Sequence, residues 1–227
     1  MTASKILSSQ FFKNKNTIKI AKQLLGKFLM RRYRGKTRAY IITEVEAYDG
    51  FKDKASHAHL GKTERNKIMF GDAGHWYVYF TYGMHWMLNI VTGPKEYPAA
   101  ILIRSVRIAG RPESSRRTAL NSPEHGRGTT INGPARLTKA LHIDKKFNGK
   151  KADKKSGLWI AASNPLRRAS PKGRENRRLN IGNPPSPKAS ADDSHSFKRM
   201  RIKKSPRVGV DYAGPIWAKK LYRFSIS

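Results

Sequence analysis

The chain contains no cysteine and few acidic residues. Its 227 residues include 47 Lys and Arg against 15 Asp and Glu, so the formal net charge is +32. The lack of cysteine excludes disulfides, thiolate zinc sites and a cysteine nucleophile. The excess of positive charge is larger than solubility requires and indicates a polyanionic partner, most simply nucleic acid. No apolar run approaches the roughly 18 residues of a membrane-spanning helix, so we expect no membrane partner.

The length of the chain favours one well-packed domain, because a second core of this size would be cramped. We therefore expect a single domain over residues 1–227, acting as a monomer. The segment Met1 to Phe12 is too short and too polar for a secretory signal. The expected compartment is a bacterial cytoplasm, in association with the nucleoid. In a eukaryote it would be the nucleus, since the basic cluster from Lys198 to Lys204 can serve as a nuclear signal.

Local patterns predict helices and strands in mixed order. Apolar residues with helical spacing predict helices over residues 17–25 and 133–141. Aromatic and β-branched runs predict strands over 28–33, 38–48, 77–81, 85–91, 99–108 and 157–162, with closing elements at 207–210 and 221–226. Turns at Gly35-Lys36 and Tyr82-Gly83 join neighbouring strands. The predicted fold class is α+β, built on an antiparallel sheet.

The strand over residues 38–48 carries two glutamates. If this strand is regular, its period of two places on one face Tyr40, Ile42, Glu44 and Glu46. The other face would then carry Ile41, Thr43 and Val45. Glu46 would lie near the end of the strand.

The segment from Asn164 to Pro206 differs from the rest of the chain in composition. It is rich in Pro, Ser, Asn, Arg and Lys and has few apolar residues, so it cannot bury enough surface to offset its ordering entropy. We interpret residues 164–206 as a basic, low-complexity insertion that is disordered. A second interpretation is a DNA-tethering arm, because its many cations would release counterions on any duplex. Such an arm adds affinity without sequence specificity.

The few acidic residues are concentrated beside a set of aromatic residues. None precedes Glu44, and six then lie between Glu44 and Asp72. If the partner is DNA, the reaction that best explains a carboxylate among aromatic rings is removal of a damaged base from its sugar. The nucleotide must leave the stack to be reached, and the expelled base needs a stacked pocket. Tyr48 and Tyr79 are candidates for its two walls and His57 for a third side.

The remaining candidate residues follow from the same chemistry. Tyr82, beside Gly83 at a predicted hairpin tip, can fill the gap that the displaced base leaves. Glu46 is the candidate general base, which activates water and stabilises an oxocarbenium-like sugar. Asn89 can probe a base edge. Arg104 can hold a flanking phosphate with its planar fork, and Arg136, on the basic side of the helix over 133–141, is a further candidate for a contact with the DNA backbone.

Each candidate also has an ordinary structural interpretation. Glu46 could be a salt-bridge partner in a basic chain, and the tyrosines could be core residues of strands. His57 and His59 could be solvated loop residues. The two histidines together with Asp53 and Asp72 match no zinc spacing, so we expect no metal and no cofactor.

In combination, these motifs closely resemble the alkyladenine (3-methyladenine) DNA glycosylase family. The segments that carry the resemblance extend over most of the chain and are Leu24-Leu25-Gly26-Lys27, Glu44-Val45-Glu46-Ala47-Tyr48, Arg65-Asn66, Met69-Phe70, Tyr77-Val78-Tyr79, Tyr82-Gly83-Met84, Asn89, Leu102-Ile103-Arg104, Gly133-Pro134, Leu158-Trp159-Ile160 and Arg207-Val208-Gly209-Val210. Several motifs in a fixed order are hard to obtain by chance.

The resemblance implies a fold, an activity and residue roles. It implies one α+β domain with a curved antiparallel sheet flanked by helices, and a metal-independent, monofunctional enzyme that leaves an abasic site. The residue matching Glu46 activates water, those matching Tyr48, Tyr79 and His57 line the base pocket, and the one matching Tyr82 intercalates. The residue matching Asn89 excludes normal guanine, and the one matching Arg104 helps to position the site.

The substrate expected from this resemblance is double-stranded DNA with alkylated or deaminated purines. The competing interpretation is a non-enzymatic architectural DNA-binding protein, in which Tyr82 wedges into the duplex without base chemistry. An RNA-binding protein is a third interpretation, based on charge alone. Glu46 argues against the architectural protein, because a pure binder gains nothing from a carboxylate beside DNA.

Overall fold

The computed structural model describes residues 5–109, 129–164 and 201–226. The helical elements are α1 (Ser9–Phe12), α2 (Thr17–Leu24), η1 (Lys67–Phe70), α3 (Pro134–Ala140), η3 (Lys145–Phe147), η5 (Asp211–Ala213) and α5 (Gly214–Ala218). The strands are β1 (Phe28–Tyr33), β2 (Lys36–Asp49), β3 (Trp76–Thr81), β4 (His85–Val91), β5 (Ala99–Ile108), β6 (Thr130–Asn132), β7 (Leu158–Ala161), β8 (Lys203–Ser205) and β9 (Arg223–Ser225). In the described parts, no helix is long and apolar enough to cross a membrane.

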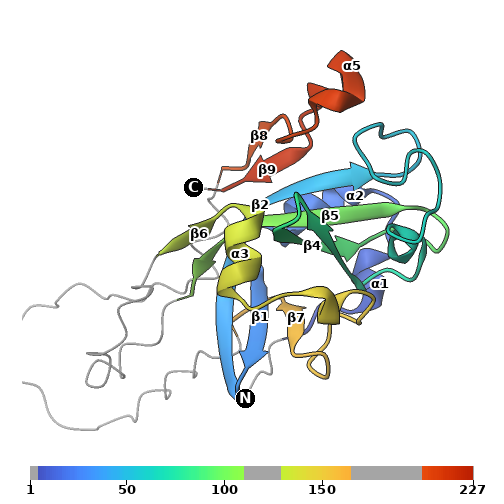
Figure 1. Ribbon diagram of the computed structural model, residues 1–227. Coiled ribbons are helices and arrows are strands. Elements are labelled where there is room, and N and C mark those ends of the chain that lie inside the picture. The colour runs from blue at the N-terminus through green and yellow to red at the C-terminus, as the bar shows by residue number, and fades with distance from the viewer. Residues whose placement is uncertain (1–4, 110–128, 165–200, 227) are drawn as a thin grey trace, which may run out of the picture.

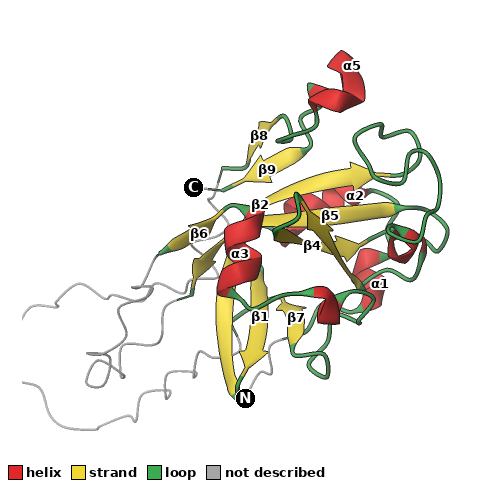
Figure 2. Ribbon diagram, in the orientation of Figure 1, coloured by secondary structure: helices red, strands yellow, loops and turns green. Residues whose placement is uncertain are grey.

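The strands form one curved sheet in the order β3-β4-β5-β2-β1-β7 (Figure 1). All of the strand pairs are antiparallel, and β6 pairs with β5, β9 with β2 and β8 with β9. The helices are short segments around this sheet, as the colouring in Figure 2 shows. The predicted α+β class with a curved antiparallel sheet flanked by helices is confirmed.

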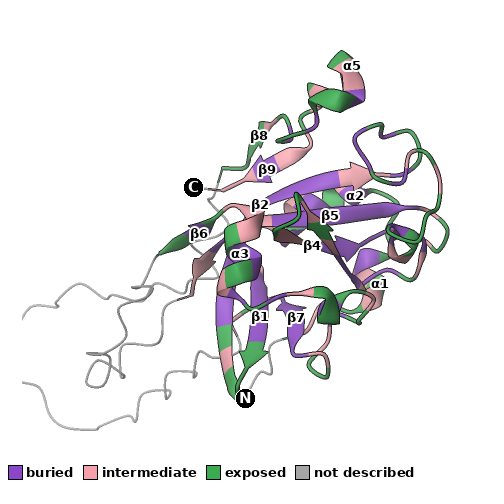
Figure 3. Ribbon diagram, in the orientation of Figure 1, coloured by how far each residue is buried: buried purple, intermediate pink, exposed green. Residues whose placement is uncertain are grey.

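The main core lies between the sheet and the helices α2 and α3. Helix α2 packs against β2, and α3 packs against β4 and β5. Asn16 caps α2 by accepting the Lys19 backbone N–H at 2.8 Å. Thr138 ties α3 to β4 through a 2.9 Å hydrogen bond to the Trp86 carbonyl. Figure 3 shows that β5 is buried over most of its length and β2 in two stretches, so the sheet centre is the most protected part of the fold.

A β-bulge in β2 changes which residues share a face, and it corrects the regular strand predicted over residues 38–48. The pairing of β2 with β5 shifts register between Ile42 and Glu44 and again between Glu44 and Val45. Before the bulge, Ile42 belongs to the main core, and after it Val45 and Ala47 do. One extra residue therefore reverses the alternation. Glu46 therefore lies on the face opposite to Ile42, whereas the regular strand predicted from the sequence placed these two residues on one face.

The C-terminal segment closes the sheet through β9, which lies within the closing element predicted over residues 221–226 and pairs with both β2 and β8. The other predicted closing element, residues 207–210, forms no strand. Within the segment 164–206, residues 165–200 lie outside the described residues, whereas Lys203–Ser205 form β8. The predicted insertion without structure is therefore too long at its C-terminal end. Backbone pairing to β9 suffices to order these three residues without buried apolar side chains.

Arg31 joins the end of α3 to the sheet. Its side chain is buried and donates to the carbonyls of Leu141 at 2.7 Å and His142 at 3.0 Å. It also donates to its neighbour Arg32 at 2.6 Å, and its guanidinium lies 4.7 Å from the centre of the Phe147 ring. One planar cation thus satisfies carbonyls at the C-terminal end of α3, which have no partners within the helix.

We predict that Arg31→Ala lowers the free energy of unfolding by about 3 kcal/mol, since it leaves several buried carbonyls without a donor. Chemical denaturation monitored by circular dichroism measures this. Arg38 is the matched control because it pairs directly with Arg31 in the sheet yet is exposed. Arg38→Ala should change the unfolding free energy by less than about 0.5 kcal/mol. Equal losses in both variants would contradict the role given to Arg31.

Candidate active site

A cavity of about 370 Å³ lies where β2, β3, β4 and β5 meet the N-terminal end of α3 and the segment before η5. All but one of the site residues predicted from the sequence line it, and these are Glu46, Tyr48, His57, Tyr79, Tyr82, Asn89 and Arg104. Arg136 does not line it. That residue is exposed on α3, directly after Pro134 and Ala135, which do line the cavity.

Glu46 is a fully buried carboxylate with three polar neighbours. Its Oε1 accepts the Val208 backbone N–H at 2.9 Å and lies 3.2 Å from the Arg104 guanidinium. Its Oε2 accepts the Tyr48 hydroxyl at 2.9 Å. Burial raises the pKa of Glu46, although Arg104 and both hydrogen bonds oppose that rise. The result is an oriented carboxylate with little solvation, which makes it a stronger proton acceptor than an exposed one.

Arg104 is held between two carboxylates. Besides Glu46, it contacts Glu44, whose Oε1 lies 3.4 Å from the Arg104 Nε. Glu44 is itself held by the Ser105 hydroxyl at 2.8 Å and by Arg223 of β9 at 3.1 Å. These contacts support a role for Arg104 in positioning Glu46. Its predicted contact with a flanking phosphate stays a prediction.

Aromatic rings form the wall of the cavity beside Glu46. The ring of Tyr79 lies 4.6 Å from that of His57 and 5.2 Å from that of Tyr77, measured between ring centres. The guanidinium of Arg65 lies 5.3 Å from the Tyr79 ring and donates to the Phe80 carbonyl at 3.1 Å. Burial raises the pKa of Tyr77 to about 12, so its hydroxyl stays protonated at neutral pH. The wall is therefore aromatic, with rings inclined to one another by 33° and 75°, and Arg65 contacts it without lining the cavity.

His57 is uncharged at neutral pH. Its Nδ1 lies 3.2 Å from the Tyr77 hydroxyl, and Asn66 holds its backbone carbonyl through a 2.9 Å hydrogen bond. Although His57 is partly exposed to solvent, desolvation of its ring and the nearby Arg65 charge lower the pKa of His57 to about 4. A neutral imidazole can accept or donate one hydrogen bond without repelling a cationic ligand.

Asn89 is buried on β4 and lines the cavity. Its Nδ2 donates to the Tyr77 carbonyl at 3.1 Å and to the Met87 carbonyl at 3.4 Å. Two acceptors on one amide nitrogen fix the side chain in a single orientation. Asn89 therefore limits the shape of a bound ring at a defined position.

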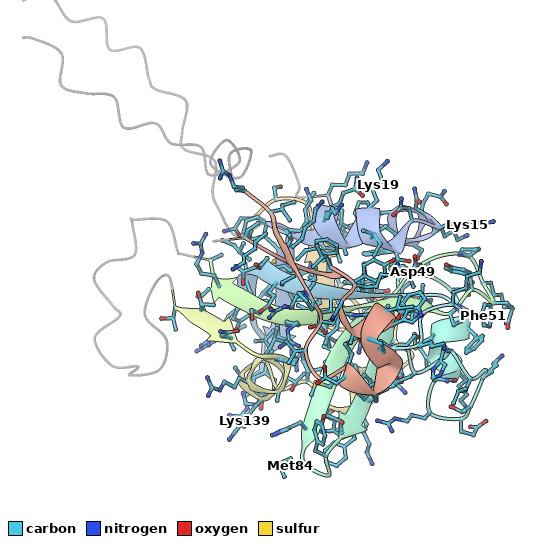
Figure 4. The ribbon with its side chains drawn as sticks, turned by 90° about the horizontal axis from the view of Figure 1, so that it is seen from above. Lys15, Lys19, Asp49, Phe51, Met84 and Lys139 are labelled. Carbon is cyan, nitrogen blue, oxygen red and sulfur yellow. The ribbon has the colours of Figure 1, made fainter. Side chains whose placement is uncertain are left out.

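Tyr82 lies at the tip of the β3–β4 hairpin, where the sequence predicted it. Thr81 pairs with His85, and both Tyr82 and Gly83 have positive φ, at 53° and 66°. A positive φ is uncommon for a residue other than glycine and is often found at functional sites. The Tyr82 side chain is 78% exposed, and Met84, two residues further, projects from the same edge of the molecule in Figure 4. The hairpin thus presents an aromatic ring beside the mouth of the cavity.

A buried ion pair that the sequence did not reveal holds two edges of the cavity together. Both nitrogens of the Arg207 fork contact the Asp53 carboxylate, at 2.5 and 2.8 Å, and both side chains are fully buried. Arg207 also donates to the Ala47 carbonyl at 2.8 Å and stacks on Tyr48 at 4.8 Å. This pair fixes Val208, and hence the N–H that Glu46 accepts. The only sequence signal was the motif Arg207 to Val210, which has no local periodicity.

Tyr212 is a second residue that the prediction missed. It lines the cavity, is 67% exposed, and donates to the Ala55 carbonyl at 2.9 Å. An isolated tyrosine in a turn carries no pattern, so its place at the cavity mouth depends on the tertiary structure.

The arrangement favours hydrolysis near a planar ring. A buried carboxylate that can take a proton from water stands beside aromatic walls that can hold such a ring, within a cavity large enough for one. Among residues 5–109, 129–164 and 201–226, no group of three or more His, Asp or Glu side chains could hold a metal ion.

Comparisons with known proteins agree with the resemblance seen in the motifs. A family model described as Methylpurine-DNA glycosylase (MPG) matches residues 10–227. A protein of Methanocella arvoryzae is 36% identical over 205 residues, which cover 89% of this chain and 84% of that protein. One of Anaeromyxobacter sp. is 34% identical over 220 residues, covering 97% and 88%.

A third relative, from Ehrlichia ruminantium, is 42% identical over 144 residues, covering 63% of this chain and 66% of that protein. The aligned part thus spans about two thirds of the Ehrlichia protein. All three relatives carry the name "Putative 3-methyladenine DNA glycosylase".

We predict that the His57 ring titrates with a midpoint near pH 4, which NMR of the histidine ring protons can measure. In the unfolded chain a histidine titrates near pH 6.5, so between about pH 6.5 and 4 unfolding takes up a proton that the folded protein does not bind. This contribution to stability is present above pH 6.5 and is lost as the pH falls through that window.

Two variants separate the causes of this shift. Arg65→Gln should raise the His57 midpoint, because it removes the neighbouring positive charge. His57→Gln should make the loss of stability between pH 6.5 and 4 less steep. A His57 midpoint at or above 6.5 in the intact protein would refute the neutral imidazole.

Proposed function

This chain belongs to the methylpurine-DNA glycosylase family, and from that premise we propose that it removes 3-methyladenine and related purines from duplex DNA through a water activated by Glu46. Family membership confirms the enzyme class predicted from the sequence, a DNA glycosylase acting in DNA repair. The proposal adds the mechanism, the residue roles, the extension to other alkylated and to deaminated purines, and action as a monomer.

The observation that carries this proposal is the buried Glu46 carboxylate beside a cavity with aromatic walls. In the proposed reaction, the oxygen of a water attacks C1′ of the sugar and one water proton moves to Glu46. The C1′–N bond breaks, and its electron pair leaves with the base. Ionised Glu46 also stabilises positive charge that develops on the sugar. The products are a free base and an abasic site.

An alkylated purine needs little help to leave. A base such as 3-methyladenine carries positive charge while it is attached to the sugar, and it leaves as a neutral molecule. A second acid is therefore not required for this substrate. Deaminated purines are neutral and need a proton as they leave, so we expect slower release of these bases.

The aromatic walls support recognition of an electron-poor base. A cationic ring between Tyr48 and Tyr79 gains cation–π attraction that a neutral ring lacks, worth roughly 0.5 to 2 kcal/mol. Neutral His57 adds no repulsion to such a ring. Asn89, held by two carbonyls, would meet the exocyclic amine of guanine and so exclude that normal base.

Tyr82 is the proposed wedge that fills the gap left by the displaced nucleotide. Its exposure at the hairpin tip places the ring where a duplex over the cavity mouth would lie. Inserting a side chain between base steps costs unstacking energy, and new stacking on the tyrosine ring offsets part of that cost.

We predict that Glu46→Gln reduces base release by a factor of about 10³, because the amide cannot accept the water proton. Single-turnover release from a duplex with one hypoxanthine or one 3-methyladenine analogue measures this in the presence of a chelator.

The rate of base release by the intact protein should depend on pH. As the pH is lowered, the rate should fall with a midpoint above the ordinary glutamate pKa of 4.5, since burial raises the pKa of Glu46 and only its ionised form acts.

Glu44→Gln is the matched control for this substitution. Glu44 is two residues away and contacts the same arginine, but it does not line the cavity. We expect this variant to retain activity within about tenfold, as for loss of a partly exposed ion pair. Similar losses in both variants, or full activity of Glu46→Gln, would refute the role of Glu46 as the base.

We predict that Tyr82→Ala weakens binding to a lesion duplex by about 1 to 3 kcal/mol, which corresponds to one lost stacking contact. Fluorescence anisotropy with a labelled duplex measures the dissociation constant. Tyr82→Phe keeps the ring and should bind like the intact protein. Unchanged affinity of the alanine variant would remove the wedge assignment.

A further inference from the structure

Helix α3 leads away from the cavity mouth and carries exposed positive charge. Its first two residues, Pro134 and Ala135, line the cavity. Arg136 and Lys139 follow on its exposed side, and neither takes part in a salt bridge with a described residue. Seven helical residues span about 10 Å at 1.5 Å each. Helix α3 therefore begins at the cavity and carries exposed cations away from it.

The far end of α3 is joined directly to the end of the β1–β2 hairpin. Arg31 of β1 donates to the carbonyls of Leu141 and His142, which follow the helix. The ring of Tyr33 stacks on His142, with 4.2 Å between centres and 16° between planes. In Figure 1 the hairpin extends from the sheet beside the lower end of α3. The helix and the hairpin therefore form one continuous surface.

The hairpin end adds further exposed cations. Arg34 is exposed in the turn, with its guanidinium 5.3 Å from the Tyr33 ring. Lys154 and Lys155 are exposed in the adjacent loop, which is tied to β1 by a 2.9 Å hydrogen bond from Arg32 to the Lys154 carbonyl. The one carboxylate in that loop, Asp153, accepts the backbone N–H of Ser156 at 2.9 Å.

We propose that one arm of the DNA duplex runs from the cavity mouth along α3 to the β1–β2 hairpin, where these cations contact its phosphates. We call this the α3–hairpin surface and define it by Arg136, Lys139, Arg34, Lys154 and Lys155. The proposal rests on the proposed function, because it takes the cavity mouth as the position of the displaced nucleotide. Successive phosphates of one strand are about 3.4 Å apart along the duplex, so α3 alone spans about three base-pair steps.

A duplex fits this surface better than an acidic protein does. The cations lie on three connected elements, α3, the β1–β2 hairpin and the loop that carries Lys154, and the first of these begins at the cavity, as a surface that follows a DNA backbone requires. A protein interface would be expected to have buried aromatic or apolar anchors at its centre. Beyond the cavity mouth, Tyr33 is the only exposed large apolar side chain among the described residues of α3, the β1–β2 hairpin and the loop 148–157, and His142 already stacks on it.

Duplexes with asymmetric arms test this proposal. An uncleavable abasic-site analogue is placed about three base pairs from one end, with a long arm of about 15 base pairs, roughly 50 Å, on its 5′ side or on its 3′ side. The strand that carries the analogue has a direction, so the α3–hairpin surface can contact the long arm in only one of the two duplexes. Binding is measured over a range of salt concentrations.

The test variant combines Arg34→Asn, Lys154→Gln and Lys155→Gln. Asparagine is chosen because Arg34 has φ 47°, which asparagine tolerates better than most residues. The control variant combines Lys13→Gln, Lys15→Gln and Lys19→Gln. These lysines are exposed at and before α2, and Figure 4 shows Lys15 and Lys19 on the opposite edge of the molecule from Lys139. Both variants lose the same charge, and thermal unfolding checks that both are folded.

The expected result is a loss confined to one duplex. For that duplex the test variant lowers the slope of log K against log salt by about 0.9 for each lost phosphate contact, up to about 2.7 for three. The other duplex should respond as it does to the control variant. Equal loss for both duplexes, or a loss no larger than that of the control, would overturn the proposal.

Base release by the intact protein is measured in parallel on a lesion duplex. If bases are released but the test variant weakens binding to both duplexes equally, the α3–hairpin surface is rejected and the proposed function stands. If the test variant weakens binding to one duplex only and no base is released, the surface is supported and the proposed chemistry is rejected. The two proposals therefore fail in distinguishable ways.

Discussion

The burial of one carboxylate is the constraint on which the rest of the site depends. A fully buried Glu46 loses its hydration, and an unpaired buried charge would cost several kcal/mol. Its partners come from three separated parts of the chain: Tyr48 on the same strand, Arg104 on β5 and the backbone N–H of Val208 near the C-terminal end. The sheet, the bulge and the closing segment must therefore all be in place before Glu46 has its partners. Catalytic competence and folding are linked in this way.

Two arginines support that carboxylate. Arg104 is shared between Glu46 and Glu44, while Arg207 is fixed by Asp53 and stacks on Tyr48. Both arginines are held by other residues and do not depend on Glu46 alone. Their charges thus remain near the carboxylate when it changes protonation state. A rigid environment of this kind stabilises developing charge without reorganisation, which is how preorganised sites lower barriers.

Three acidic side chains lie in buried or half-buried positions around the cavity and exposed basic side chains lie on the surface, an arrangement that suits a polyanionic substrate. The chain has few acidic residues, and three of them, Glu44, Glu46 and Asp53, are used as ion-pair partners around the cavity. Exposed cations lie elsewhere, on α2, on α3 and at the end of the β1–β2 hairpin. A uniformly positive protein would bind any phosphate equally. Negative charge confined to a buried position acts on the reacting sugar and does not repel the backbone outside.

Local residue patterns were sufficient to predict most strands, helix α2, the hairpin with Tyr82 at its tip, and seven of the residues that line the cavity. These features depend on periodicity, turn chemistry and residue type, which neighbouring positions express. The tertiary structure decided the rest. A single bulge residue reversed the faces of β2, β9 paired with β2 and ordered β8, and Arg104 came to lie between two carboxylates. Val208 reached Glu46 across 162 residues, and Arg207 reached Asp53 across 154. Contacts at such separations leave no local pattern, because they arise only when distant segments are packed together.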